Sequence, residues 1–272
     1  MLQGQLESIR AATLNNNIIW LESFGCQVTR EGNLISIEHP EVPGYNVRLI
    51  FGSSEVALTQ LHAVLEQTKH RKVRPDIFID EVSSSPAISS ALNSRGFAVT
   101  AVNVTKFSSW DPAHEETPVT LQPAAPGDFD QWTSLYSDGF SHYGQEVEYD
   151  RYRWRKAFAA QNIRHWFITR EQEKLGVCQT CQGSSVTGIY SLTLKSTKRG
   201  LHYLRPAIRA LRSKLTENGE VPVYFERLWN KGWFNKQRIV GDPHGFKVVR
   251  IMIGFGSLPE KIERKVPPRT LA

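Results

Sequence analysis

Residues 187–211, TGIYSLTLKSTKRGLHYLRPAIRAL, decide the fold. Together with Val186, the first eight of them predict a strand over 186–194. A helix is predicted over 202–216, because its apolar positions recur at spacings of three and four: Leu204, Ile208, Leu211 and Leu215. The connection between the two elements is basic. The stretch therefore predicts a strand that leads through a cationic loop into the start of a helix.

Further strands and helices surround this stretch in the order of an α/β fold. In the second half, strands are predicted at 119–122, 165–169, 175–180, 186–194, 221–226 and 246–255. Helices are predicted there at 128–140, 148–160, 202–216 and 232–240. The first half has a shorter version of the same order, with strands at 34–38, 46–51, 76–80 and 97–107 and helices at 55–69 and 86–94.

A polar segment with two prolines, SSWDPAHEETP at 108–118, separates the halves and has the composition of a linker. Each half ends in the order helix, Gly-Phe, strand, with the Gly-Phe pair at 96–97 and again at 245–246. This shared ending indicates a divergent internal repeat. We therefore predict modules over 1–110 and 119–258, a linker at 111–118 and a polar tail at 259–272.

In its order of elements, the second half resembles the GNAT superfamily of acyl-CoA-dependent N-acyltransferases. The first half resembles a truncated, structural copy. The resemblance implies two GNAT-like modules, each with a mixed central sheet flanked by helices, and a splayed strand in that sheet. In the superfamily an apolar residue ends the splayed strand five residues before an Arg or Gln that opens a phosphate loop. Leu194 and Arg199 hold these two positions here.

The loop departs from the superfamily pattern, because the two small residues expected after Arg199 fall on His202 and Leu204. Three interpretations stay open. The loop takes another path with His202 on the phosphate, the donor is not held by its nucleotide end, or the site is inactive.

The resemblance implies acetyl-CoA or a longer acyl-CoA as donor. Free N–H groups at a helix start bind phosphate, and an unpaired strand edge binds a pantetheine arm as an added strand would bind. The superfamily's asparagine on the last helix, which contacts this arm, matches Asn235. The candidate donor-binding residues are Leu192, Thr193, Leu194, Lys198, Arg199, Gly200, His202 and Asn235.

Transfer to an amine requires removal of a proton, because a lysine-like amine has a pKa of about 10.4. Glu226, at the end of a predicted buried strand, is the first catalytic candidate, with an ion pair to a nearby arginine as the alternative. Tyr190, on the splayed strand, is the second, with a core role as the alternative. Strand alternation places Ser191 on the face opposite Tyr190, so at most one of the two faces the donor.

The run 140–154, FSHYGQEVEYDRYRW, lies where relatives build the acceptor pocket. Its carboxylates would attract a cationic small-molecule or peptide amine, while its aromatic residues suit a core or a lid equally well. The candidate acceptor residues are Tyr143, Glu146, Glu148 and Asp150.

Charge is divided unevenly along the chain. Residues 1–117 hold 9 Lys and Arg against 13 Asp and Glu, and residues 118–272 hold 24 against 14. The second half therefore attracts anions, which suits a phosphorylated donor, an acidic acyl carrier protein or nucleic acid. Nucleic acid ranks last, because the chain has no recognised nucleic-acid motif.

We expect no metal, because Cys178 and Cys181 are three apart on a strand and face opposite sides. We also expect a cytoplasmic protein without a membrane span. The opening residues lack a secretory signal, no window of eighteen residues is wholly apolar, and three cysteines suggest no disulfide framework.

These patterns together predict an acyltransferase that passes an acyl group from acyl-CoA directly to an amine, without a covalent enzyme intermediate. Two alternatives stay open. One is a transferase with a phosphopantetheinyl carrier protein or a long-chain acyl donor, acting in natural-product or lipopeptide modification. The other is a non-catalytic binding or scaffold protein that kept the fold.

Overall fold

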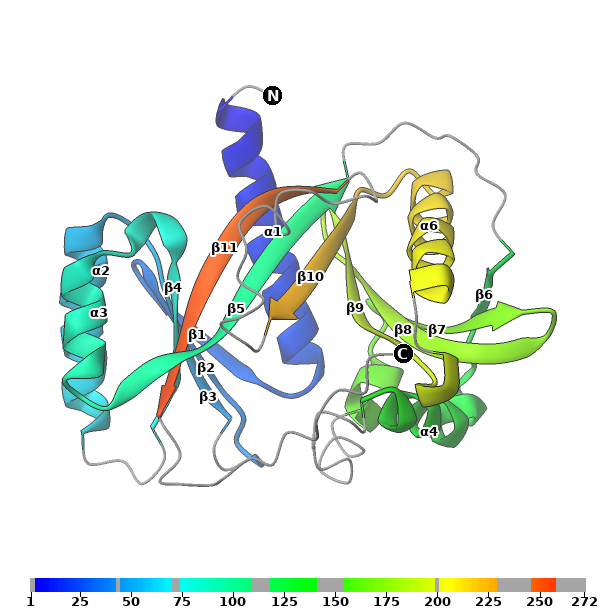
Figure 1. The fold of residues 1–272 in the computed structure, drawn as a ribbon, viewed down its shortest axis with the longest axis horizontal. Coiled ribbons are helices and arrows are strands. Elements are labelled where there is room, and N and C mark those ends of the chain that lie inside the picture. Colours follow the sequence, from blue (N-terminus) through cyan, green and yellow to red (C-terminus); the bar gives the residue numbers. More distant parts are fainter. Residues whose placement is uncertain are drawn as a thin grey trace.

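The computed structural model describes residues 3–42, 45–69, 74–108, 118–140, 154–198, 201–228 and 246–257. These ranges form a single sheet of eleven strands with helices on both faces (Figure 1). The strand order is β1-β2-β3-β4-β11-β5-β10-β9-β8-β7-β6, with parallel and antiparallel neighbours. The predicted α/β class with a mixed central sheet is confirmed.

The first half contributes α1 Gln3–Ser23, β1 Gln27–Glu31, β2 Leu34–Glu38, β3 Asn46–Ile50, α2 Ser54–Thr68, β4 Asp76–Asp80, α3 Pro86–Asn93 and β5 Phe97–Ser108. The second half contributes β6 Thr120–Pro123, α4 Phe129–Phe140, β7 Ile163–Arg170, β8 Glu173–Gln182, β9 Thr187–Leu194, α6 Leu201–Glu217, β10 Pro222–Leu228 and β11 Phe246–Ser257. Residues 154–159 are also helical. The predicted elements within the described ranges are present, but α1 and β1 were not predicted. The predicted helix at 232–240 lies outside the described residues, as does nearly all of the linker.

The helices divide between the two faces of the sheet. On one face, α2 and α3 cover the strands of the first half and α6 covers those of the second. On the other face, α4 and residues 154–159 cover β7 and β8. Helix α1 also lies on this second face, where it contacts strands of both halves (Figure 1).

The last strands of the two halves, β5 and β11, pair antiparallel in the middle of the sheet. Matching the two Gly-Phe pairs predicts that residue n of the first half corresponds to n + 149, since 246 − 97 = 149. The register follows this shift: Phe246 pairs with Ser108, and the equivalent residues Phe97 and Ser257 also pair. The internal repeat therefore appears in the sheet as a twofold pseudo-symmetry.

The pseudo-twofold axis passes through the pair Asn103 and Met252, because 103 + 149 = 252. Even the irregularities obey the symmetry. The register skips Val249 on β11 and its equivalent Thr100 on β5. On each side of the axis, antiparallel strands lead to a parallel pair, β3 with β4 and β9 with β10. The predicted repeat thus has the same strand order in both halves.

Each half places its last strand beside the preceding strand of the other half. Strand β11 lies between β4 and β5, and β5 lies between β11 and β10. The two predicted modules therefore share one sheet and are joined by the backbone hydrogen bonds of four central strands. The exact residue boundaries of the modules stay a prediction.

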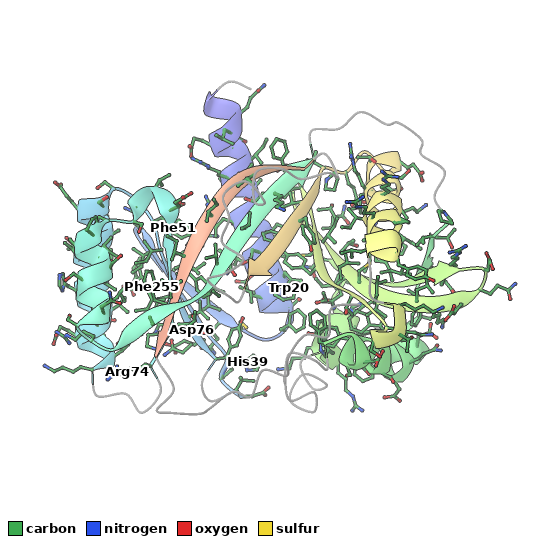
Figure 2. All side chains as sticks on the ribbon, viewed as in Figure 1. Trp20, His39, Phe51, Arg74, Asp76 and Phe255 are labelled. Carbon is green, nitrogen blue, oxygen red and sulfur yellow. The ribbon has the colours of Figure 1, made fainter. Side chains whose placement is uncertain are left out.

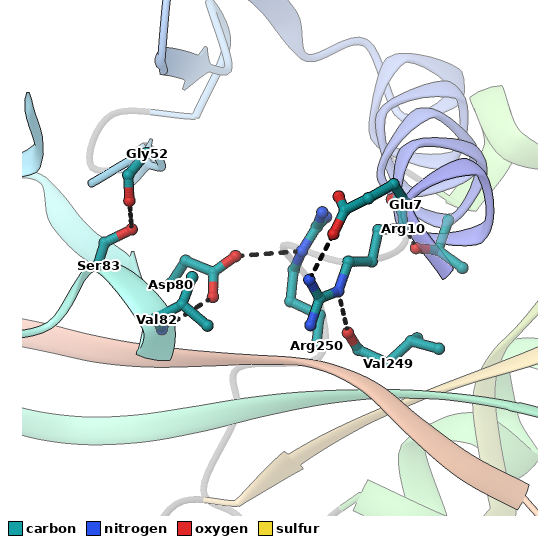
Figure 3. A network of polar contacts seen from close by, with 9 residues as sticks. Glu7, Arg10, Gly52, Asp80, Val82, Ser83, Val249 and Arg250 are labelled. Atoms are coloured by element: carbon teal, nitrogen blue, oxygen red, sulfur yellow. Dashed lines mark hydrogen bonds and ion pairs between the residues drawn. The ribbon is translucent and has the colours of Figure 1, made fainter. Parts of the chain in front are cut away.

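Helix α1 is anchored to the sheet by polar contacts at its first turns (Figure 3). Arg10 Nε donates to the carbonyl of Val249 at 2.8 Å, and its guanidinium also binds Glu7. Beside it, Arg250 pairs with Asp80 at 3.4 Å. Because the skipped residue Val249 is free of the β5 register, its carbonyl is available to the helix. The irregularity in β11 thus provides an acceptor for the start of α1.

Candidate functional site

The two halves differ where β9 and β10 part. Parallel pairing of these strands covers only residues 187–189 of β9, opposite 222–224 of β10. Beyond that point β9 stays paired with β8 and β10 with β5, so residues 190–194 and 225–228 do not pair with each other. In the first half, β3 and β4 stay paired from Val47 to Ile50. The predicted splayed strand is present in the second half.

The pseudo-symmetry shows what occupies the equivalent place in the first half. Glu226 and Ile79 pair with residues 104 and 253, which are equivalent because 104 + 149 = 253. Ile50 is the parallel partner of Ile79, and Ser191 would be the partner of Glu226 if the pairing of Ile189 with Tyr224 continued for two more residues. Ser191 is therefore equivalent to Ile50. Ile50 and Ile79 are both 0% exposed and lie in one apolar cluster. Two buried isoleucines of the first half therefore hold the strand positions that Ser191 and Glu226 hold at the opening in the second.

A bulge marks the point at which β9 leaves β10. Tyr190 pairs with Gln179 and Thr193 with Val177, so Ser191 and Leu192 lie opposite a single residue of β8. Ser191 has a φ of 53°, in the left-handed region that disfavours residues with a side chain. Bulges and left-handed non-glycine residues both cluster at functional sites. The sequence analysis did not predict this bulge.

The bulge overturns the prediction that Ser191 and Tyr190 face opposite sides. Ser191 Oγ donates to Gln179 Oε1 at 3.3 Å, and Trp20 Nε1 donates to the same oxygen at 3.2 Å. The Trp20 ring in turn stacks on Tyr190 at 4.4 Å between centroids. Both side chains thus lie on the α1 side of the sheet, because the extra residue cancels the alternation of the strand.

Tyr190, a catalytic candidate, lies in the core beneath α1. Its ring is stacked between Phe225 and Trp20, the latter labelled on α1 in Figure 2. Its hydroxyl donates to Asn16 Oδ1 at 2.8 Å. Burial raises the pKa of the Tyr190 hydroxyl well above 10. A phenol that is stacked on both faces and already bonded is poorly placed to exchange protons with a substrate. The geometry thus favours the core role among the two roles left open for this residue.

The predicted donor strand, residues 192–194, is approached closely by its neighbours. A Cβ on Gly139 of α4 would lie 2.1 Å from Thr193 Oγ1, and one on Gly176 of β8 would lie 2.1 Å from the Thr193 carbonyl. Leu194 is buried against α6, and Leu192 packs against the same cluster. Both faces of this segment are therefore covered, and among the described residues its edge toward β10 has no strand partner.

Two acidic side chains from other elements contact the described part of the predicted phosphate loop, residues 195–198. The Asp138 carboxylate accepts from the backbone N–H and from the hydroxyl of Ser196, each at 2.7 Å. Glu173 pairs with Lys198 at 3.2 Å and with Lys195 at 3.5 Å. The Lys198 hydrogen bond is the main cause that lowers the pKa of Glu173. An anionic ligand at residues 195–198 would thus meet two acidic side chains.

Several predicted site residues cannot be placed. Those outside the described residues are Tyr143, Glu146, Glu148, Asp150, Arg199, Gly200 and Asn235. For His202 and Glu226 the structure describes the backbone alone: the first lies in the first turn of α6 and the second in β10. Continued for two residues past its last pair, Ile189 with Tyr224, the parallel register would set the backbone of Glu226 opposite Ser191.

A buried polar chain that the sequence analysis missed lies behind the opening. Gln179, which is 0% exposed, bonds His165 Nε2 at 2.7 Å through its amide nitrogen. His165 stacks on Phe158 at 3.6 Å between centroids. Both polar residues lie inside strands beside apolar residues, and that position was the available sequence signal. Burial lowers the pKa of His165 to about 3, so the ring is neutral near pH 7.

The buried His165 predicts a loss of stability in mild acid. Its folded pKa of about 3 lies below the ordinary value of 6.5, so the unfolded chain binds the proton more strongly. The contribution of His165 to the free energy of unfolding is complete above pH 6.5 and falls by up to about 1.4 kcal/mol for each unit by which the pH decreases. We expect His165→Gln, which keeps an acceptor for Gln179, to make the free energy of unfolding less dependent on pH. Urea unfolding measured from pH 7 to 4.5 tests this. Parallel slopes for the two proteins would contradict it.

The described cysteines and helices show no sign of a metal site or a membrane span. Cys178 and Cys181 are buried in different clusters, and burial raises both thiol pKa values, that of Cys181 to about 12. No group of three His, Cys, Asp or Glu side chains in the described ranges could hold a metal ion. The described helices include none with the length and apolar character needed to cross a membrane.

No family model and no curated protein matches the sequence. Solved structures do match the fold. A GCN5-related N-acetyltransferase from Kribbella flavida superposes with a TM-score of 0.60 at 11% identity, over 92% of this chain and 94% of that one. One from Sphaerobacter thermophilus gives a TM-score of 0.61 at 11% identity, over 82% and 76%. A GNAT-family acetyltransferase from Colwellia psychrerythraea gives 0.52 at 10%, over 83% and 81%.

Coverage this high means that both halves take part in the match. At such low identity the likeness concerns the fold alone. The predicted resemblance is therefore confirmed at the level of the fold, and the chain has the architecture of the GCN5-related N-acetyltransferases, extended over two halves that share one sheet.

Proposed function

We propose that the protein is an N-acyltransferase that moves an acyl group from an acyl thioester, acetyl-CoA or a longer acyl-CoA, to an amine. The observation that carries the proposal is the parting of β9 from β10 in one half only. A sheet that leaves backbone groups unpaired in its interior loses hydrogen bonds, so a ligand that restores them is expected. The first half, with isoleucines at the equivalent place, serves as scaffold.

In the proposed reaction the thioester lies along the free edge of β9. The amine nitrogen attacks the carbonyl carbon, the new C–N bond forms and the C–S bond breaks, releasing a thiolate. Glu226 takes the proton lost by the amine, and backbone N–H groups stabilise the oxyanion. Direct transfer needs no covalent enzyme intermediate, and the buried thiols of raised pKa are not poised to form one.

We assign the acceptor to the α4 face of the sheet. Helix α4 and residues 154–159 pack together through Trp132, Tyr136 and Trp154 over β7 and β8. The acidic acceptor candidates all lie in the segment that joins these two helices. The proposed acceptor is therefore a cationic amine, either a small molecule or a peptide, that approaches from this face. The buried free thiols suit a reducing compartment such as the cytoplasm.

A carrier-protein donor is the second candidate, and the loop before α6 favours it. Asp138 and Glu173 occupy groups of residues 195–198 that phosphates would otherwise bind. A donor presented by a carrier protein brings one phosphate instead of a nucleotide. The binding of such a donor would be weakened less by repulsion from the two carboxylates at this position.

The test measures thiol release from acetyl-CoA, from a long-chain acyl-CoA and from an acylated carrier protein, each with a mixture of primary amines. Mass spectrometry then identifies the acylated amine. Amine-dependent release with any donor supports the proposal and ranks the donors. Absence of release with all three, from protein that is folded by circular dichroism, would leave the non-catalytic scaffold as the function.

The donor prediction uses two variants of opposite expected sign. Arg199→Ala should weaken acyl-CoA binding by about 1.5–3 kcal/mol, the range for a hydrogen bond to a charged group. Asp138→Asn removes a negative charge beside the same loop and should strengthen binding. Isothermal titration calorimetry with acetyl-CoA measures both. Unchanged affinity in both variants would mean that the nucleotide end is not held at this loop, and the carrier-protein donor would take first place.

A further inference from the structure

Ser191 combines three features that the proposed reaction has not yet used. It lies at the bulge, at the second position of β9 past its pairing with β10. It has a left-handed backbone with a φ of 53°. It is half-buried, and its hydroxyl is bonded to the fully buried Gln179.

The hydrogen bonds around Gln179 have a fixed direction. Its amide nitrogen can only donate, so His165 Nε2, at 2.7 Å, is the acceptor. The other end of the amide, Oε1, then faces Trp20 Nε1, which can only donate. Ser191 must therefore also donate its hydroxyl hydrogen to Oε1. Because this chain is buried and His165 is neutral, the orientation is kept without the substrate.

The directed hydroxyl can make one kind of contact with a substrate. With its hydrogen committed to Gln179, Ser191 Oγ offers lone pairs alone. It can accept a hydrogen bond from an N–H, but it has none left to give to a carbonyl oxygen or a thiolate. Of the two reacting groups, the thioester and the amine, the amine is the one that carries such a donor.

The position of Ser191 agrees with this chemistry. Its side chain points to the sheet face covered by α1 and α4, the face to which we assigned the acceptor. The predicted phosphate loop instead leads into α6, on the opposite face. A serine held at positive φ also costs conformational energy that a glycine would avoid. A requirement for the hydroxyl accounts for that cost.

We infer that Ser191 is an acceptor-binding residue, whose hydroxyl accepts a hydrogen bond from the attacking amine and aims its lone pair at the thioester. Gln179, with Trp20 and His165 behind it, is the positioning residue that sets the orientation of the hydroxyl. This inference rests on the proposed function and names the group that holds its acceptor. Ser191 binds the amine N–H and takes no proton itself.

The experiment compares Ser191→Gly and Ser191→Ala with Ser185→Ala, an exposed serine in the turn before β9. Steady-state kinetics use acetyl-CoA and the primary amine on which the wild type is most active. We expect both Ser191 variants to lower kcat/KM for the amine by about 10- to 100-fold, the effect of one lost hydrogen bond. The KM for acetyl-CoA should change less than twofold, and Ser185→Ala should match the wild type.

Melting temperature separates binding from folding, because Ser191→Gly relieves the left-handed backbone and should melt at or above the wild type. Unchanged kcat/KM for the amine in Ser191→Gly would overturn the inference while leaving the proposed function standing. A wild type without any transfer would overturn the proposed function instead. The inference then depends on NMR of the Gln179 side-chain amide during titration with benzylamine. Shifts in the wild type that Ser191→Gly abolishes support it, and a wild type without shifts overturns it.

Discussion

Replacing Glu226 with glutamine is expected to lower turnover by about 10² to 10⁴, the usual contribution of a well-placed general base. The parallel register of β9 and β10, continued past its last pair, would set the backbone of this residue opposite Ser191, and the first half has the buried Ile79 at the equivalent position. Glutamine preserves the shape of the side chain and removes its ability to take a proton. The loss should shrink at high pH, because more of the acceptor amine is then neutral before it binds.

The control for this variant is Glu217→Gln, at the end of α6, whose side chain is 46% exposed. The pH–rate profile and the melting temperature are measured for both proteins. A lower melting temperature with an unchanged rate per folded molecule would make Glu226 a structural partner of nearby arginines. Tyr190→Phe would then test the remaining catalytic candidate, although its hydroxyl is already bonded to Asn16.

Replacing Asn16 with leucine is expected to lower the free energy of unfolding by about 3–5 kcal/mol. Its amide nitrogen donates to the carbonyls of Cys181 and Val186, at 2.8 and 3.2 Å, and its oxygen accepts from Tyr190. Leucine has nearly the same volume, so it excludes water while leaving these polar groups without this partner. Each buried group left unsatisfied costs about 1–3 kcal/mol.

Asn15→Leu is the matched control, because the neighbouring side chain is exposed and the hydrogen bond that it accepts from Arg30 lies at the surface. We expect a change within about 0.5 kcal/mol for it. Urea unfolding of both variants measures the difference. Equal stabilities would mean that α1 is held by its apolar contacts and that Asn16 contributes little.

The shared sheet suggests why a half without the opening is retained. Strand β5 of the first half pairs with β10 from residue 223 to 228, along the edge of β10 that faces away from β9. The strand that carries Glu226 therefore stays paired with β5 where its pairing with β9 has ended. An opening inside a sheet needs rigid support on both sides, and here one of the two supports comes from the first half.

The sequence by itself determined the strands and helices around the site, since apolar periodicity depends on local spacing. It also determined the repeat, because the two Gly-Phe pairs give the shift of 149 that the register of β5 and β11 obeys. The splayed strand came from the resemblance carried by Leu194 and Arg199. These features follow from residues close together in the chain.

The tertiary structure alone decided what depends on distant residues. Helix α1 was missed because three consecutive asparagines, 15–17, weaken a helical pattern, and Asn16 is stabilised by partners about 165–174 positions away. The bulge at Ser191 reversed the predicted side of that residue, because one extra residue in a register cannot be seen in the strand's own sequence. The position of β11 beside β4 likewise depends on pairing between the halves. Long-range hydrogen bonds fixed these choices, and local propensity carries no information about them.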